Sequence, residues 1–167
     1  MRTSSDLFRC NINMKITAQV EYGLRIMLRI TACRDQKGLS IRQLSEAEGL
    51  STNYVAKLTR VLRMKGLINS TRGHMGGYIL SKPPAAITVN DTLKALGGSF
   101  FDKKFCESHT GMLTLCTNSV DCSIRSLWSM IQASLDKLLD KVTLEDMVKN
   151  ENDVTVVLRN IIVGSLV

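Results

Sequence analysis

Apolar side chains recur every three or four residues in the first part of the chain, which is the spacing of one face of a helix. Residues 14–34 show this pattern and predict a first helix, for which Thr17 is a plausible N-cap. A second helix is expected over residues 41–48, because Ser40 begins a capping-box pattern and Gly49 follows as a stop signal. The expected inner face of this second helix consists of Ile41, Leu44 and Ala47.

The next periodic segment, residues 52–64, predicts a third helix directly after a tight turn that contains Gly49. Ser51 can cap this helix, and Gly66 ends it. Two short helices joined through such a turn are typical of a helix-turn-helix, and the second has the polar outer face that the major groove requires. The expected inner face consists of Val55, Leu58, Val61 and Leu62, and the outer face of Asn53, Lys57, Arg60 and Arg63.

Two short β-prone runs follow, at residues 67–70 and 78–80, and the glycine-rich loop between them at 71–77 predicts a hairpin. A hairpin directly after a recognition helix is the wing of a winged helix. Its glycines would let the backbone come close to a partner, and Arg72 could enter a minor groove or contact phosphate. Another short helix is expected at 89–96.

The second half of the chain begins with a segment of no clear periodicity, residues 99–123, which contains Cys106, Cys116 and Cys122. The long helix predicted after it has apolar residues in alternating steps of four and three, which is a heptad seam. A helix from a second copy would cover this seam, and packing on the helix's own domain is the alternative. Thr143 opens one more short turn. The seam consists of Ile124, Trp128, Ile131, Leu135, Leu138 and Val142.

These elements predict a mainly α fold with a small β-hairpin: a winged helix-turn-helix domain, then a cysteine-bearing loop and a long dimerisation helix. The length of 167 residues fits one domain, or one domain with an appendage. The expected division is an N-terminal extension at 1–13, the winged helix-turn-helix domain at 14–98, the loop at 99–123, the dimerisation helix and closing turn at 124–149, and a tail at 150–167.

The composition is ordinary for a globular protein, with 44% hydrophobic and 22% charged residues, and it excludes a disordered or fibrous chain. No apolar run reaches the roughly 18 residues of a membrane span. Residues 1–13 lack the apolar segment of a secretory signal, so a cytoplasmic protein is expected. The five cysteines are then better interpreted as thiols or metal ligands than as disulfides.

The net charge of +7 is concentrated in the predicted DNA-reading half of the chain. Residues 1–82 contain 14 Lys and Arg against 5 Asp and Glu, whereas residues 83–167 contain 8 against 10. The segment 51–82 has no acidic residue at all. A basic half of this kind favours a polyanion such as nucleic acid as a partner. The alternative is a solvated basic face that binds nothing.

The order of these motifs resembles the Rrf2 family of bacterial winged-helix regulators, over residues 14–149. Residues 1–13 are therefore expected to be an upstream extension or the product of a mis-assigned start. The matching motifs are MKIT at 14–17, EYGLR at 21–25, STNY at 51–54, RMKGL at 63–67, RGHMGGY at 72–78 and TLEDMV at 143–148.

The resemblance implies a homodimeric transcription factor, usually a repressor, that binds a pseudo-palindromic operator in double-stranded DNA. Two recognition helices about 34 Å apart would read adjacent turns of the major groove. Base-edge and phosphate contacts are expected from Asn53, Tyr54 and Lys57. For each candidate, the alternative is a solvated surface side chain. The complete set of DNA-binding candidates is Ser51, Thr52, Asn53, Tyr54, Lys57, Arg60, Arg63, Arg72, Gly73 and His74.

Family members that sense iron or redox state use three cysteines in this loop to hold an iron–sulfur cluster. The resemblance therefore implies that Cys106, Cys116 and Cys122 bind such a cluster, of either the two-iron or the four-iron type. Thiolates are its natural ligands, although the nine-residue interval between the first two cysteines is longer than usual in the family. The fourth ligand is expected to be Glu21, which matches an acidic position in other relatives, with His109 as the alternative.

The expected mechanism is a switch that responds to iron, nitric oxide or redox state, in which the cluster shifts the loop and the long helix and so re-spaces the recognition helices. The alternative is the same DNA-binding regulator without a cluster, responding through cysteine oxidation or a protein partner. The loop cysteines could also bind nothing. An enzyme is not expected, because the sequence has no glycine-rich phosphate loop, no His–Glu metal pair and no nucleophile elbow.

Overall fold

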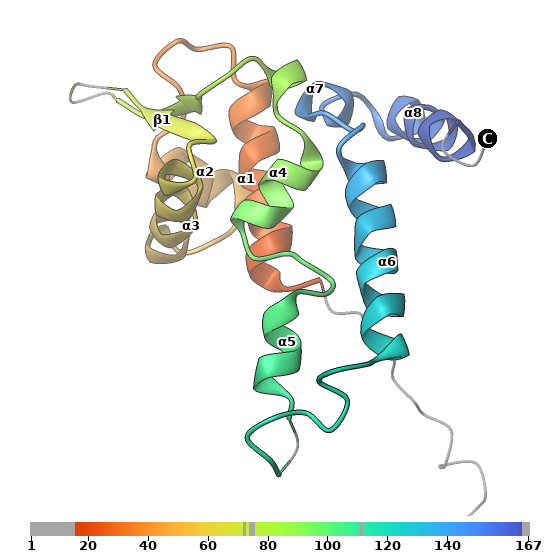
Figure 1. Cartoon of the computed structure of the whole chain (residues 1–167). Helices are drawn as coiled ribbons and strands as arrows, with labels where there is room; N and C mark the ends of the chain where they lie inside the picture. The colour runs from red at the N-terminus through yellow and green to blue at the C-terminus, as the bar shows by residue number, and fades with distance from the viewer. Residues whose placement is uncertain (1–15, 72, 74–75, 111, 165–167) are drawn as a thin grey trace, which may run out of the picture.

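A computed structural model describes residues 16–71, 73, 76–110 and 112–164. Helix α1 stands at the centre, with α2, α3 and the hairpin on one side and α6 on the other (Figure 1). The elements in chain order are α1 (Ala18–Ala32), α2 (Ile41–Glu48), α3 (Thr52–Met64), β1 (Ile68–Ser70), β2 (Tyr78–Leu80), the 3-10 turn η1 (Pro84–Ala86), α4 (Val89–Ala95), α5 (Lys103–Ser108), α6 (Ser123–Leu139), α7 (Leu144–Met147) and α8 (Glu151–Val163). The predicted fold class, mainly α with a small β-hairpin, is confirmed.

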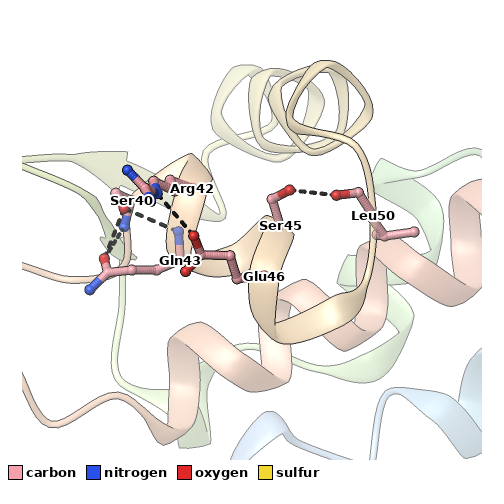
Figure 2. Close-up of polar contacts among 6 residues, drawn as sticks. All are labelled: Ser40, Arg42, Gln43, Ser45, Glu46 and Leu50. Carbon is pink, nitrogen blue, oxygen red and sulfur yellow. Dashed lines mark hydrogen bonds and ion pairs between the residues drawn. The ribbon is translucent and has the colours of Figure 1, made fainter.

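Local capping signals explain where the first helices begin and end. Helix α1 begins at Ala18, directly after the predicted cap Thr17, whose hydroxyl oxygen accepts a backbone hydrogen bond. The capping box of α2 is confirmed, since the Ser40 hydroxyl accepts from the backbone of Gln43 and the Gln43 side chain accepts from the backbone of Ser40 (Figure 2). Gly49 ends α2 at a φ of 64°, a left-handed conformation that favours glycine.

The predicted hairpin is present, and its strands pair antiparallel with Ile68 opposite Leu80. A further segment pairs with it, because the backbones of Leu39 and Tyr78 exchange hydrogen bonds of 3.1 and 2.9 Å. A Cβ at Gly77 would lie 2.6 Å from the carbonyl carbon of Leu39. The close backbone approach at this glycine is therefore made to the protein's own chain.

The core lies where α1 to α4, the hairpin and α7 meet, and it corrects part of the predicted inner faces. Ala47 is exposed and the neighbouring Glu48 is buried instead. On α3, Val61 is only half-buried, while Thr59 is buried and its hydroxyl donates a hydrogen bond of 3.0 Å to the carbonyl of Val55. The largest fully buried apolar side chains are Ile26, Met27, Leu44, Val55, Leu58, Leu62, Ile68, Ile87, Val142 and Leu144.

Polar contacts join the long helix α6 to α4. The ammonium group of Lys94 lies 3.1 Å from a carboxylate oxygen of Asp136, and the amide of Asn90 donates a hydrogen bond of 2.7 Å to the carboxylate of Asp140. The last seam residue, Val142, lies beyond the end of α6 in a buried turn, where its carbonyl accepts from the backbone of Val89. The spacing predicts that the helix continues to this residue, but α6 ends at Leu139.

The rest of the seam lies partly against its own domain. Trp128 meets the ring of Phe100 edge-on, with 5.7 Å between centroids. Three further seam residues, Ile131, Leu135 and Leu138, are half-buried in the single chain. Ile124, Leu127 and Met130 stay exposed. Both alternatives for this helix thus keep support, because one part of its apolar surface is packed and another is open.

Two helices lie where the periodicity predicted none. Helix α5 lies within the segment 99–123, and the side chain of Asp102 caps it by accepting a hydrogen bond of 3.1 Å from the backbone of Phe105. Helix α8 forms most of the predicted tail, and Asn150 caps it in the same way. Among the described residues, none of the helices has the length and apolar character needed to cross a membrane.

Candidate functional site

The outer face of α3 is exposed and basic, as the sequence predicts. Its six exposed DNA-binding candidates are Ser51, Thr52, Asn53, Lys57, Arg60 and Arg63. No acidic residue occurs in the segment that forms α3, so none opposes a polyanion along this face. A helix with this distribution of charge matches the chemistry of the major groove and its flanking phosphates.

Tyr54 differs from the other candidates on α3 because it is half-buried. Its ring meets the ring of Tyr22 on α1 edge-on, with centroids 6.1 Å apart and planes at 86°. This geometry is favourable for an aromatic pair and fixes the first turn of α3 against α1. The predicted DNA contact of Tyr54 stays a prediction, while its packing role is visible.

The turn between α2 and α3 is held by the side chain of Ser45. Its hydroxyl donates a short hydrogen bond to the carbonyl of Leu50 (Figure 2). The backbone of Leu50 donates one of 3.1 Å back to the carbonyl of Ser45. Because Ser51 caps α3 directly after this turn, the turn sets the direction in which α3 leaves α2. The position of the recognition helix therefore depends on a short local network.

The base of the hairpin is fixed to the rest of the domain through Thr71. Its hydroxyl lies 2.8 Å from the carbonyl oxygen of Lys37, and it accepts a hydrogen bond of 2.7 Å from the backbone of Gly77. Gly73 is exposed and has a φ of 113°, which an L side chain rarely adopts. The other two candidates of the wing, Arg72 and His74, lie outside the described residues.

The periodicity did not identify a charged cluster between α1 and the end of α2. The Glu48 carboxylate accepts hydrogen bonds from Arg25 and Arg29, which lie one turn apart on α1. The sequence signal was present but ambiguous, because an acid at the end of a short helix usually faces water. A buried acid becomes recognisable only when the fold places its partners beside it.

The three loop cysteines line one pocket. Cys106 comes from α5, Cys116 from the loop, and Cys122 from the N-cap of α6. All three are half-buried free thiols, so the structure places the three predicted cysteines on the same pocket. The sulfur of Cys122 accepts a hydrogen bond of 3.3 Å from the backbone of Arg125, and Arg125 also lines the pocket.

The candidates for a fourth ligand lie apart from this pocket. Glu21 lines a separate groove between α1, α4 and α6. The His109 ring stacks on Phe105, with its Nδ1 2.9 Å from the carbonyl oxygen of Phe105, and it is not among the residues that line the cysteine pocket. In the part of the chain that the structure describes, no three His, Cys, Asp or Glu side chains are arranged to hold a metal ion.

An exposed, acid-free helix that follows a tight turn and is flanked by a β-hairpin defines a winged helix-turn-helix DNA-binding protein. The chain belongs to the Rrf2 family, whose description is "Iron-dependent Transcriptional regulator" and whose model matches residues 16–150. It is a transcriptional regulator of the helix-turn-helix type and not an enzyme. The resemblance read from the motifs is confirmed.

Known relatives cover most of the chain. It is 31% identical over 134 residues to the transcriptional regulator CymR of Bacillus subtilis (strain 168). The aligned region covers 80% of this chain and 89% of CymR. It is 29% identical over 138 residues to IscR of Klebsiella pneumoniae (strain 342). The aligned region covers 83% of this chain and 82% of IscR. The solved structure of B. subtilis CymR, described as the global cysteine regulator, superposes with a TM-score of 0.62 over 81% of this chain and 96% of that one. An oxidized form of Staphylococcus aureus CymR, which is 28% identical, superposes with a TM-score of 0.61 over 82% of this chain and 98% of that one.

Proposed function

We propose that the protein is a homodimeric repressor that acts in the cytoplasm and binds a pseudo-palindromic operator in double-stranded DNA. The observation that carries this proposal is the exposed face of α3, where Asn53, Lys57, Arg60 and Arg63 occur without an acid. On the proposed function, α3 lies in the major groove and the wing contacts phosphates or the minor groove. Two such helices about 34 Å apart would read successive turns of the groove.

The operator can be tested without knowledge of the genes. Duplexes selected by the protein from a random library should contain two related half-sites, since a two-fold dimer reads the same sequence twice. The variant Asn53→Ala should lose discrimination among selected sequences, whereas Arg60→Gln should lower affinity evenly and reduce the salt slope by about 0.9. Selection that enriches no sequence would contradict the proposal.

The exposed part of α6 supports dimerisation. Ile124, Leu127 and Met130 are apolar and open to solvent in the single chain. A soluble protein rarely leaves such a patch uncovered, and a second copy of the helix is complementary to it by symmetry. We infer that this strip, rather than the half-buried seam residues, supplies the surface between protomers.

We further propose that Cys106, Cys116 and Cys122 hold an iron–sulfur cluster. Three half-buried thiols that line one pocket are the ligand type that a cluster takes, and Arg125, which lines the same pocket, would offset part of its negative charge. Neither of the predicted fourth ligands, Glu21 and His109, lines this pocket in the single chain, so Glu21 of a second chain is the proposed donor. When bound, the cluster would supply a centre sensitive to iron, nitric oxide or redox state.

The position of Cys122 connects the pocket to the long helix. Its sulfur caps the N-terminus of α6 by accepting the Arg125 backbone hydrogen bond. Ligation of iron by this sulfur would change the cap, and α6 contacts α4 through Lys94 and Asp136. Ligation at the loop would therefore alter how α6 sits on the DNA-binding domain and change the spacing of the recognition helices.

Anaerobic purification provides the test of the cluster. The fresh protein should contain iron and acid-labile sulfide and absorb in the visible range, and the triple variant Cys106→Ala, Cys116→Ala, Cys122→Ala should lack all three. Operator affinity should then no longer depend on the state of the cluster. Wild-type protein without iron, sulfide or visible absorbance would refute this part of the proposal and leave the DNA-binding part intact.

A second candidate keeps the DNA binding and replaces the cluster by thiol chemistry or a protein partner. Two observations favour it: the relative described as a global cysteine regulator, and the solved oxidized form of a CymR protein. On this alternative, iron-free protein responds to peroxide with a change in operator affinity, and a reducing agent reverses the change. The same anaerobic preparation distinguishes the two candidates.

A further inference from the structure

The carboxylate of Glu48 is buried at the end of α2, with 2% of its side chain exposed. Its Oε2 accepts a hydrogen bond of 2.6 Å from Nε of Arg25, and its Oε1 accepts one of 2.5 Å from Nε of Arg29. The two arginines lie one turn apart on α1, on the face that meets the end of α2. The cluster therefore joins α1 to the helix-turn-helix.

The charges of this cluster do not cancel. One carboxylate faces two guanidinium groups, which leaves one positive charge, and the side chains of Arg25 and Arg29 are 45% and 54% exposed. One arginine would suffice to compensate the buried carboxylate, so the second needs another explanation. Both hydrogen bonds to Glu48 use Nε, and no described residue accepts from the terminal nitrogens. These nitrogens have donors left for an anion from outside the protein.

Arg25 lies beside the recognition helix. Its guanidinium carbon is 5.6 Å from the centre of the Tyr22 ring, and that ring meets Tyr54 edge-on. Tyr54 belongs to the first turn of α3, next to the exposed Thr52 and Asn53. Arg25 therefore flanks the end of α3 that approaches base edges, and the phosphates of the neighbouring strand border a helix in the major groove.

We propose that Arg25 contacts a DNA phosphate from α1 and that Glu48 is the residue that positions it. The inference rests on the proposed binding of double-stranded DNA. Glu48 holds the guanidinium through Nε and leaves the terminal nitrogens for the phosphate oxygens, so less side-chain freedom is lost on binding. Arg29 keeps the buried carboxylate paired while Arg25 also serves the phosphate.

The contact is tested by the salt dependence of binding. Fluorescence anisotropy with a labelled duplex of about 30 base pairs, first of random sequence and then selected by the protein, gives log K against log salt. In Arg25→Gln, the slope should fall by about 0.9 and affinity at low salt by about tenfold. The matched control is Arg159→Gln on the exposed side of α8, which removes the same charge far from α3 and should leave the slope unchanged.

The positioning role makes a prediction of opposite sign to simple electrostatics. Glu48→Gln removes a negative charge near the DNA, so electrostatics alone predicts tighter binding. If Glu48 orients Arg25, binding instead weakens about three- to tenfold while the salt slope stays near the wild-type value, because Arg25 is still charged. Thermal unfolding of each variant shows whether the fold is retained.

Should Arg25→Gln fail to fold because Glu48 then keeps only Arg29 as a partner, the double variant Arg25→Gln, Glu48→Gln replaces it, since it removes the buried carboxylate itself. The same loss of slope is expected. A wild-type slope in the folded Arg25 variants would overturn the phosphate contact, and tighter binding by Glu48→Gln would overturn the positioning role. Wild-type protein without salt-dependent DNA binding would instead overturn the proposed function.

Discussion

The close approach of the wing to the rest of the domain can be tested at one glycine. In Gly77→Ala, a methyl group is added where the hairpin passes the segment before α2. The new carbon would lie 2.6 Å from the carbonyl carbon of Leu39 and 2.8 Å from its nitrogen and oxygen. These are backbone atoms, which have no rotamer to move to. The hairpin must therefore shift away from Leu39.

The size of the effect follows from what this shift breaks. The backbones of Leu39 and Tyr78 exchange two hydrogen bonds of 3.1 and 2.9 Å, and their loss removes about 2 kcal/mol of folding free energy. Displaced packing around the new methyl group adds about 1–3 kcal/mol. We expect Gly77→Ala to lose about 3–5 kcal/mol, which lowers the midpoint of thermal unfolding by roughly 10 °C in a chain of this size.

Urea and thermal unfolding followed by circular dichroism measure this loss, at one fixed protein concentration because oligomers gain stability with concentration. The control is Gly66→Ala. Gly66 has a left-handed conformation, at a φ of 72°, which Gly77 does not share, and its added methyl group would meet no atom within 4 Å. Only backbone strain of about 1–2 kcal/mol is expected there. If Gly77→Ala costs no more than Gly66→Ala, the reasoning from the close approach to Leu39 is wrong.

Three further perturbations give distinct results. In Ser45→Ala, the hydrogen bond to the Leu50 carbonyl is lost, so unfolding free energy should fall by about 1 kcal/mol in urea titrations, and operator affinity should fall with it. Hydrogen bonds from Thr143 hold the pKa of Asp146 below its ordinary value of 3.8, against the effect of partial burial. The stability that this gives is complete above 3.8 and is lost as pH falls through the lower folded value, so Asp146→Asn should flatten the acid limb of stability against pH. Met130 is 61% exposed on α6, and Met130→Glu should give monomers in sedimentation experiments without unfolding the chain.

Elements specified by neighbouring residues could be predicted from the sequence. Ser40 and Gln43 cap α2 through side chains three residues apart, and Gly49 ends it through its own backbone freedom. Helix α5 was not predicted, because its six residues are too few to establish a helical period and the N-cap Asp102 is its only start signal. Helix α8 was also not predicted, although Asn150 is a recognisable N-cap residue in front of it.

Contacts between distant residues could not be predicted from periodicity. The pattern places Ala47 on the inner face, but the arginines of α1 turn Glu48 inward, and no local signal records a partner about twenty residues away. The candidate site divides in the same way. The outer face of α3 follows from its own period, whereas the meeting of Cys106 with Cys122 depends on the path of a loop that the resemblance, not the pattern, indicated.

The contacts of α6 define the route by which the cysteine pocket could influence DNA binding. The side chain of Gln132 accepts a hydrogen bond of 2.9 Å from the backbone of Phe101, just before α5, and donates one of 2.8 Å to Asp136. Asp136 in turn pairs with Lys94 of α4. Helix α4 packs against α1, where Gln19 donates to the carbonyl of Leu96, and against α3. If the proposed switch operates, these contacts are the path by which a movement at the loop would reach α3. Substitutions that break the Asp136 pair should then uncouple the loop from operator affinity while both ends stay intact.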